Sequence, residues 1–328
     1  MMVLVNNLRL SDELVSEILN VTESAAIAAH KHVGSGDRKA VDGAAVKAMR
    51  LAFDRVNIDG VVIVGEGVKD NAPMLFAGER LGTGFGPELD IAVDPIDGTR
   101  LAAENLPDSV AVLSVAKSGA FFDPGPVFYM EKLICGGNAA RLSLELPLAD
   151  NLARLAAALN RPLDSLRVAV QARPRNQKYR DAVSAAGAVV VEFQDGDVAP
   201  AIRAAHPEGD IDLLIGIGGA PEGILTSTAV RSLGGFMQAR LAPQNKDEIA
   251  AAAAGNYSTD RILSLDDLVA GDGYLFLTAV TDGFALRGVV ADNAGWTTDS
   301  FIVDPHNGVV RATRRHNTVD RDRVLPAE

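Results

Sequence analysis

The chain has 328 residues, of which 48% are hydrophobic and only 5% aromatic, so the composition predicts a folded protein with a mainly aliphatic core. Its formal net charge of −12 at pH 7 argues against nonspecific binding to nucleic acid or to anionic membranes. The single cysteine, Cys135, excludes an internal disulfide. Neither a signal peptide nor an apolar run of membrane-spanning length is recognisable. We therefore expect a soluble cytoplasmic protein.

The N-terminal part predicts two helices followed by a strand. Apolar residues at helical spacing indicate a first helix over residues 11–32. A second is expected over residues 44–56, with Asp42 in front of it, either as an N-cap or as a functional carboxylate. The β-branched run 61–64 predicts a buried strand, and Glu66 stands between two glycines at its end.

A second strand is expected to end in a group of oxygen-bearing side chains. The apolar run 91–93 is followed by the hexapeptide Asp94-Pro95-Ile96-Asp97-Gly98-Thr99. Such a corner projects two carboxylates and a hydroxyl at a strand end, and hard oxygen ligands of this kind suit Mg²⁺ or Mn²⁺. An ordinary Asp-Gly turn is the alternative. Because ligand sites in α/β proteins commonly lie at strand ends, Glu66 and Asp94 could meet there.

The second half alternates strands and helices, which places a domain boundary after residue 165 and gives domains 1–165 and 166–328. Arg173-Pro174-Arg175 follows a predicted strand and could hold a phosphate, or could be a solvated basic loop. Asp195-Gly196-Asp197 ends the next strand and lacks the continuation of a calcium loop.

A glycine-rich stretch, Gly216 to Gly223, is expected to turn from a strand into a helix. Such a turn offers backbone N–H groups and a positive helix end to an anion. It lacks the ending of a P-loop and the spacing of a dinucleotide fingerprint. Glu222 at the mouth of the helix is either a ligand or a partner of the helix dipole.

Zinc, thiol and serine-nucleophile motifs are absent from the sequence. Oxygen-only ligands beside arginines indicate phosphate chemistry, in which two metal ions activate a water and neutralise phosphoryl charge.

The motifs together resemble a known family. Glu66 and the stretch Asp94 to Thr99 are similar to the lithium-sensitive, metal-dependent sugar phosphatases. The wider set resembles the class II fructose-1,6-bisphosphatases of the bacterial GlpX type, and consists of Gly36-Asp37, Asp42–Val46, Ala72–Leu75, Tyr129–Lys132, Arg173–Arg175, Asp195–Ala199 and Gly216–Gly223. The resemblance implies a layered αβαβα sugar-phosphatase fold and hydrolysis of the 1-phosphate of fructose 1,6-bisphosphate in gluconeogenesis.

The resemblance also implies roles for individual residues. The metal ligands, for Mg²⁺ or Mn²⁺, would be Asp42, Glu66, Asp94, Asp97 and Glu222. Thr99 would orient and help deprotonate the attacking water, in catalysis with Asp42, Glu66 and Asp97. The substrate would be held by Asp97, Gly98, Thr99, Tyr129, Arg173, Pro174, Arg175, Asp195, Gly196, Asp197 and Gly219. A homo-oligomer, dimer or tetramer, is expected.

Three departures from the family pattern leave the substrate open. Arg38 stands where a lysine is usual, Asn176 where a histidine is frequent, and the segment around Phe284 differs. The alternatives are the same chemistry on sedoheptulose 1,7-bisphosphate or a specialised sugar phosphate, and a sugar-phosphate-binding regulator without turnover.

Overall fold

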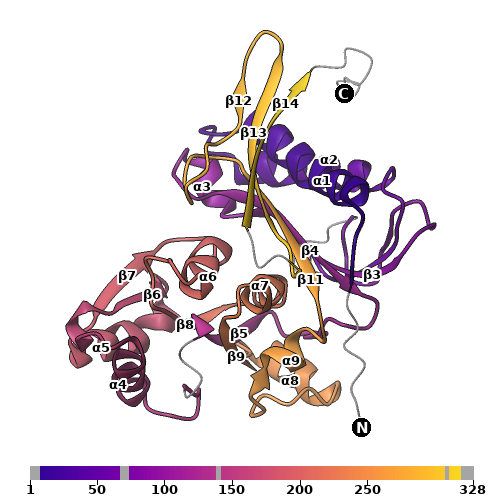
Figure 1. Ribbon diagram of the computed structural model, residues 1–328. Helices are drawn as coiled ribbons and strands as arrows, with labels where there is room; N and C mark the ends of the chain where they lie inside the picture. Colours follow the sequence, from indigo (N-terminus) through magenta and orange to yellow (C-terminus); the bar gives the residue numbers. More distant parts are fainter. Residues whose placement is uncertain (1–7, 67–73, 138–141, 307–309, 319–328) are drawn as a thin grey trace.

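The computed structural model describes residues 8–66, 74–137, 142–306 and 310–318, with the side chains of 310–312 and 317–318 left aside. Three residues of the sequence motifs, Gly67, Ala72 and Pro73, lie outside the described residues. Two mixed β-sheets and the helices around them make up the described chain (Figure 1). Within these ranges, no helix combines the length and apolar character needed to cross a membrane.

The first sheet has the strand order β12-β13-β11-β4-β3-β1-β2, with β14 also paired to β13. Its strands are β1 (Asp59–Val64), β2 (Arg80–Leu81), β3 (Glu88–Asp97), β4 (Val110–Lys117), β11 (Gly273–Ala279), β12 (Val290–Ala291), β13 (Gly295–Val303) and β14 (Val310–Thr318). β1 and β3 are parallel, and the other pairs are antiparallel. Both faces of the central strands β4 and β11 are buried, as expected of a sheet covered by helices on each side.

The second sheet has the order β10-β9-β5-β8-β6-β7. Its strands are β5 (Tyr129–Cys135), β6 (Arg167–Gln171), β7 (Val189–Phe193), β8 (Leu213–Gly219), β9 (Phe236–Leu241) and β10 (Leu263–Ser264). The chain therefore enters this sheet after β4 and returns to the first sheet at β11. The predicted division after residue 165 lies before β6, inside the segment that builds the second sheet, and stays a prediction.

The helices complete five layers. α1 (Asp12–His30) and α2 (Arg38–Phe53) cover the outer face of the first sheet, and α4 (Leu148–Leu159) and α5 (Gln177–Ala186) cover that of the second (Figure 1). α6 (Val198–Ala205) and α7 (Ala220–Ser232) lie between the sheets. The other described α-helices are α3 (Thr99–Ala103), α8 (Lys246–Ala254) and α9 (Leu265–Leu268). The αβαβα layering predicted from the family resemblance is confirmed.

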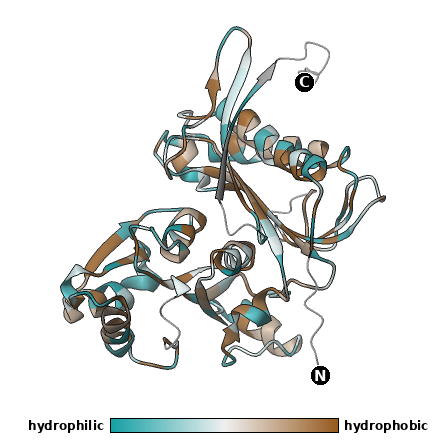
Figure 2. Cartoon of the chain, viewed as in Figure 1, coloured by the Kyte–Doolittle hydropathy of each residue, from teal (hydrophilic) through white to brown (hydrophobic). Residues whose placement is uncertain are grey.

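The residue pattern of each helix matches its layer. α1 and α2 carry hydrophobic and hydrophilic residues side by side, as helices with one buried face do (Figure 2). α7 is buried almost all round and is rich in small and hydroxyl residues. One of these, Thr228, lies 2.9 Å from Ser114 of β4, between their hydroxyl oxygens. A helix between two sheets needs this composition because it has no solvent-facing side.

The helix starts explain where Asp42 lies. Ser11 caps α1 and accepts the N–H of Leu14 at 3.2 Å. The second helix begins earlier than predicted, since Asp37 is its N-cap and accepts the N–H of Ala40 at 3.0 Å. Asp42 is therefore no cap but lies within α2, so the capping interpretation of that residue is wrong.

Candidate active site

A cleft of about 1050 Å³ lies where the ends of β1 and β3 face residues of the second sheet. It gathers almost every residue that the sequence singled out. The predicted site residues that line it are Asp42, Glu66, Asp94, Asp97, Gly98, Thr99, Tyr129, Arg173, Arg175, Asp195, Gly196, Asp197, Gly219 and Glu222. Pro174 is not among the lining residues; it begins the short 3₁₀ turn that carries Arg175.

The hexapeptide lies on an irregular strand rather than beyond a strand end. β3 continues to Asp97, and its pairing with β4 shifts register between Asp94 and Asp97. Pro95 has no N–H to give to the ladder, which favours such a bulge at this point. The prediction that the strand stops before Asp94 is wrong, and the bulge is what directs both carboxylates into the cleft.

Three carboxylates meet at the floor of the cleft. Oxygen atoms of Asp94, Asp97 and Glu222 lie within 4.8 Å of one another. Burial raises the pKa of Asp94 well above its ordinary value, and the charges of Asp97, Glu222, Glu66 and Asp42 raise it further. The pKa of Asp97 is raised well above normal by burial and by Glu222. Carboxyl groups are thus concentrated here, and all five predicted ligands lie close enough for the other four to raise the pKa of Asp94.

The carboxylate cluster fits a divalent cation. The donors are all oxygen, as hard cations prefer. Oε2 of Glu222 is buried and has no hydrogen-bond partner in the described part of the chain. Because a buried, unpaired carboxylate oxygen is costly, this atom is suited to contact a bound cation.

The glycine-rich stretch takes a different form from the predicted turn. β8 runs to Gly219, and α7 begins at the next residue, so there is no loop between strand and helix. A Cβ atom on Gly219 would lie 1.8 Å from Oε2 of Glu222, and one on Gly218 would lie 1.8 Å from Oδ2 of Asp197. These glycines are needed because acidic side chains occupy the space that a Cβ would take.

Asp97 is also held by the second half of the chain. Its carboxylate accepts the N–H of Asp197 at 3.2 Å and that of Val198 at 2.9 Å, at the start of α6. The positive end of a helix favours a carboxylate in this position. The backbone of the Asp195-Gly196-Asp197 stretch therefore contacts the predicted metal site directly.

Two arginines form the basic part of the cleft. The guanidinium of Arg175 lies 4.6 Å from the centre of the Tyr129 ring and donates to the Ile217 carbonyl at 2.9 Å. Arg173 is paired with Asp195 at 3.0 Å. Stacking and backbone contacts fix the plane of Arg175, so this side chain is already oriented for an anion.

Thr99 is placed by a tight turn. Gly98 has a left-handed backbone (φ 82°), which other residues rarely adopt, and Thr99 is the first residue of α3. The Thr99 hydroxyl donates to the Ile96 carbonyl at 3.1 Å. Its oxygen can still accept a hydrogen bond from a water in the cleft.

One residue of the site was missed by the sequence reasoning. Lys132 of β5 is 2% exposed, and its Nζ contacts Asp197 and the carbonyl of Gly219. Burial raises the pKa of Glu222, and the charge of Lys132 opposes this effect. A lysine within an apolar strand was the available signal, because lysine is almost never buried without a partner.

None of the three departures from the family pattern is among the described residues that line the cleft. Arg38 is exposed and pairs with Glu104 at 3.3 Å. Asn176 is fully buried, accepts the N–H of Ile217 at 2.7 Å and donates to its carbonyl at 3.0 Å. Phe284 packs on another aromatic ring, that of Phe301. None of these contacts makes the departures determinants of the substrate.

Comparison with known proteins is consistent with this geometry. Residues 12–317 match the model of a family described as bacterial fructose-1,6-bisphosphatase, glpX-encoded. The chain belongs to this family. The fructose-1,6-bisphosphatase 1 class 2 of Escherichia coli strain K12 is 40% identical over 324 residues, covering 94% of this chain and 96% of that protein. The fructose-1,6-bisphosphatase class 2 of Shigella flexneri is similar to the same extent.

Proposed function

We propose that this protein is a class II fructose-1,6-bisphosphatase, a phosphoric monoester hydrolase that converts fructose 1,6-bisphosphate to fructose 6-phosphate and phosphate in gluconeogenesis. The assignment of the reaction class rests on membership of the family. Within the structure, the supporting observation is a cleft in which the carboxylates Asp94, Asp97 and Glu222 share space with Arg173 and Arg175.

The metal requirement follows from the donor set. We propose that Asp42, Glu66, Asp94, Asp97 and Glu222 hold Mg²⁺ or Mn²⁺. When bound, such ions lower the pKa of a water molecule and neutralise charge on the phosphoryl group. Burial and the neighbouring carboxylates raise the pKa of Asp94 and of Asp97, and a cation bound among them would favour their charged forms.

The other residues divide the remaining tasks. Thr99, oriented through Ile96, accepts a hydrogen bond from the attacking water and helps take its proton. Arg175, fixed over Tyr129, binds the phosphate that is not cleaved, with Arg173 beside it. Asp195 and Asp197 accept hydrogen bonds from sugar hydroxyls. Gly98, Gly196 and Gly219 let the backbone approach the substrate, and Pro174 sets the turn before Arg175.

Phosphate release from a panel of sugar phosphates tests the proposal. The panel contains fructose 1,6-bisphosphate, fructose 1-phosphate, fructose 6-phosphate and sedoheptulose 1,7-bisphosphate, each with Mg²⁺, with Mn²⁺ and with chelator. We expect metal-dependent release, fastest with fructose 1,6-bisphosphate. A faster reaction with another sugar would change the substrate but keep the chemistry. If no sugar phosphate releases phosphate, the proposal that the protein is an enzyme is rejected, and a sugar-phosphate-binding regulator is favoured.

The family resemblance also supports one proposal on cellular location and one on oligomeric state. We propose that the protein acts in the cytoplasm and that it forms a homo-oligomer, dimer or tetramer. Light scattering of the purified protein over a range of concentrations measures the second, and a concentration-independent monomer would reject it.

A further inference from the structure

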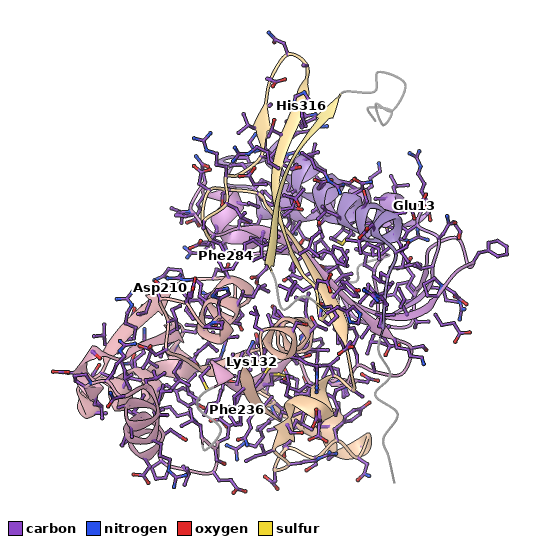
Figure 3. All side chains as sticks on the ribbon, viewed as in Figure 1. Glu13, Lys132, Asp210, Phe236, Phe284 and His316 are labelled. Carbon is purple, nitrogen blue, oxygen red and sulfur yellow. The ribbon has the colours of Figure 1, made fainter. Side chains whose placement is uncertain are left out.

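Lys132 is a buried cation that contacts the starts of two helices. It lies on β5 beside the middle helices, in the interior of the protein (Figure 3). Its Nζ lies 2.5 Å from Oδ2 of Asp197 and donates to the Gly219 carbonyl at 3.0 Å. Asp197 is the N-cap residue of α6, and Gly219 is that of α7. One side chain therefore ties both helix starts to the central strand of the second sheet.

Each of these helix starts presents a carboxylate of the metal cluster. The N–H groups of Asp197 and Val198 hold Asp97. Glu222 lies three residues after Gly219, in the first turn of α7. Displacement of either helix start would move one carboxylate relative to the other.

Two glycines, one in β8 and one in α7, make space for the side chain of Lys132. A Cβ on Gly218 would lie 2.9 Å from Nζ, and a Cβ on Gly223 would lie 3.2 Å from Cδ of Lys132. Both distances are tighter than ordinary side-chain contacts. Gly218 and Gly223 thus leave room for the side chain of Lys132.

Lys132 does not belong to the cleft lining. Its side chain is 2% exposed, and its head group contacts Asp197 and the carbonyl of Gly219. Both of these residues line the cleft. Lys132 is therefore placed to hold lining residues from behind.

We propose that Lys132 is a positioning residue, which sets the distance between Asp97 and Glu222 by holding the starts of α6 and α7. The inference rests on the proposed function, because it assigns Lys132 to the same metal site. It adds a residue whose effect reaches the cation through the backbone of Asp197, Val198 and Gly219.

The test compares Lys132→Met with the wild type and with Lys178→Met, an exposed lysine on α5 outside the cleft. We expect Lys132→Met to weaken Mn²⁺ binding, measured by calorimetry without substrate, by about 10- to 100-fold, as loss of a supporting partner of a ligand does. The kcat for fructose 1,6-bisphosphate should fall to a similar extent, with KM little changed. Lys178→Met should behave as the wild type.

A second variant separates an effect on folding from an effect on Mn²⁺ binding. Lys132→Met leaves the buried Asp197 carboxylate unpaired, so the double variant Lys132→Met with Asp197→Asn should unfold at nearly the wild-type temperature in chelator. Weak Mn²⁺ binding by this folded double variant supports positioning. Wild-type or tighter Mn²⁺ binding by either variant overturns it. A wild type that releases no phosphate, combined with weaker Mn²⁺ binding by the variants, would reject the proposed function and retain the role of Lys132.

Discussion

The carboxylate of Asp97, at the end of β3, accepts a hydrogen bond of 2.9 Å from the backbone N–H of Val198, the first residue of α6. These two residues are 101 positions apart in the sequence. The bond joins the first sheet to the helices of the middle layer at the point where the carboxylates gather. The candidate metal site therefore depends on both halves of the chain.

Asp97→Asn is expected to abolish most activity while leaving the protein folded. The amide keeps one oxygen for the N–H of Val198 but removes a charge from the metal cluster. Since a metal ion supplies several kcal/mol of transition-state stabilisation, we expect kcat/KM to fall by on the order of 10²-fold or more. Phosphate release and far-ultraviolet circular dichroism measure the two effects.

Asp90→Asn provides the matched control. Asp90 is a buried carboxylate on the same strand, accepts the N–H of Phe121 at 3.0 Å, and does not line the cleft. Its replacement should change stability more than kcat/KM. Equal losses of activity in both variants would mean that any buried charge on β3 is needed, and would contradict the assignment of Asp97.

The family resemblance predicted the layers, and the sequence pattern predicted a carboxylate cluster but not the contacts that shape it. The apolar runs 61–64 and 91–93 located β1 and β3, and the carboxylates after them made Glu66, Asp94 and Asp97 candidate ligands, which they remain. The start of α2 was misplaced because Asp37 and Asp42 are both plausible caps, and only the fold chooses between them. The role of Lys132 depends on partners more than 60 residues away, and no local pattern contains that information.

Asn176→Ala should reduce stability without changing substrate preference. The substitution leaves the N–H of the half-buried Ile217 without its acceptor, whereas the Ile217 carbonyl keeps its bond from Arg175. One unpaired buried group costs about 1–3 kcal/mol. Urea unfolding should show this loss, and the ratios of kcat/KM across the sugar panel should be unchanged. Altered ratios would make Asn176 a specificity determinant after all.

Arg175→Lys should weaken substrate binding. A lysine cannot keep the planar contact with Tyr129 together with the bond from Nε to the Ile217 carbonyl. Loss of a charged hydrogen bond of roughly 1.5–3 kcal/mol corresponds to about a 10- to 100-fold increase in KM for the bisphosphate. Arg180→Lys, on α5 and paired with Glu192, is the control. An unchanged KM in Arg175→Lys would exclude phosphate binding by Arg175.

Glu23 should make stability depend on pH. Its pKa is raised because α1 buries it against β13 and β14, although Thr298 and Arg315 donate to it. A carboxyl whose folded pKa is above its unfolded value contributes stability below about pH 4.5, and loses that contribution as pH rises through the folded pKa. Glu23→Gln should therefore gain stability relative to the wild type as pH rises from about 4.5 to 8. Urea unfolding in chelator measures the difference, and a relative loss with rising pH would show that the Arg315 pair dominates.

Gly219→Ala tests whether the glycine is there for the carboxylate of Glu222. The backbone of Gly219 (φ −65°, ψ 139°) suits alanine, so the substitution introduces no backbone strain. The added Cβ would overlap Oε2 of Glu222, and this flexible side chain must turn away from the cluster. We expect a nearly unchanged free energy of unfolding, with Mn²⁺ affinity and kcat/KM both lowered by about 10- to 100-fold.

Gly43→Ala is the control. Gly43 lies in α2 beside Asp42, and a Cβ added there would have nothing within 4 Å, so this variant should keep full activity and stabilise the helix by about 0.5–1 kcal/mol. Wild-type Mn²⁺ affinity in Gly219→Ala would mean that Glu222 is not a ligand.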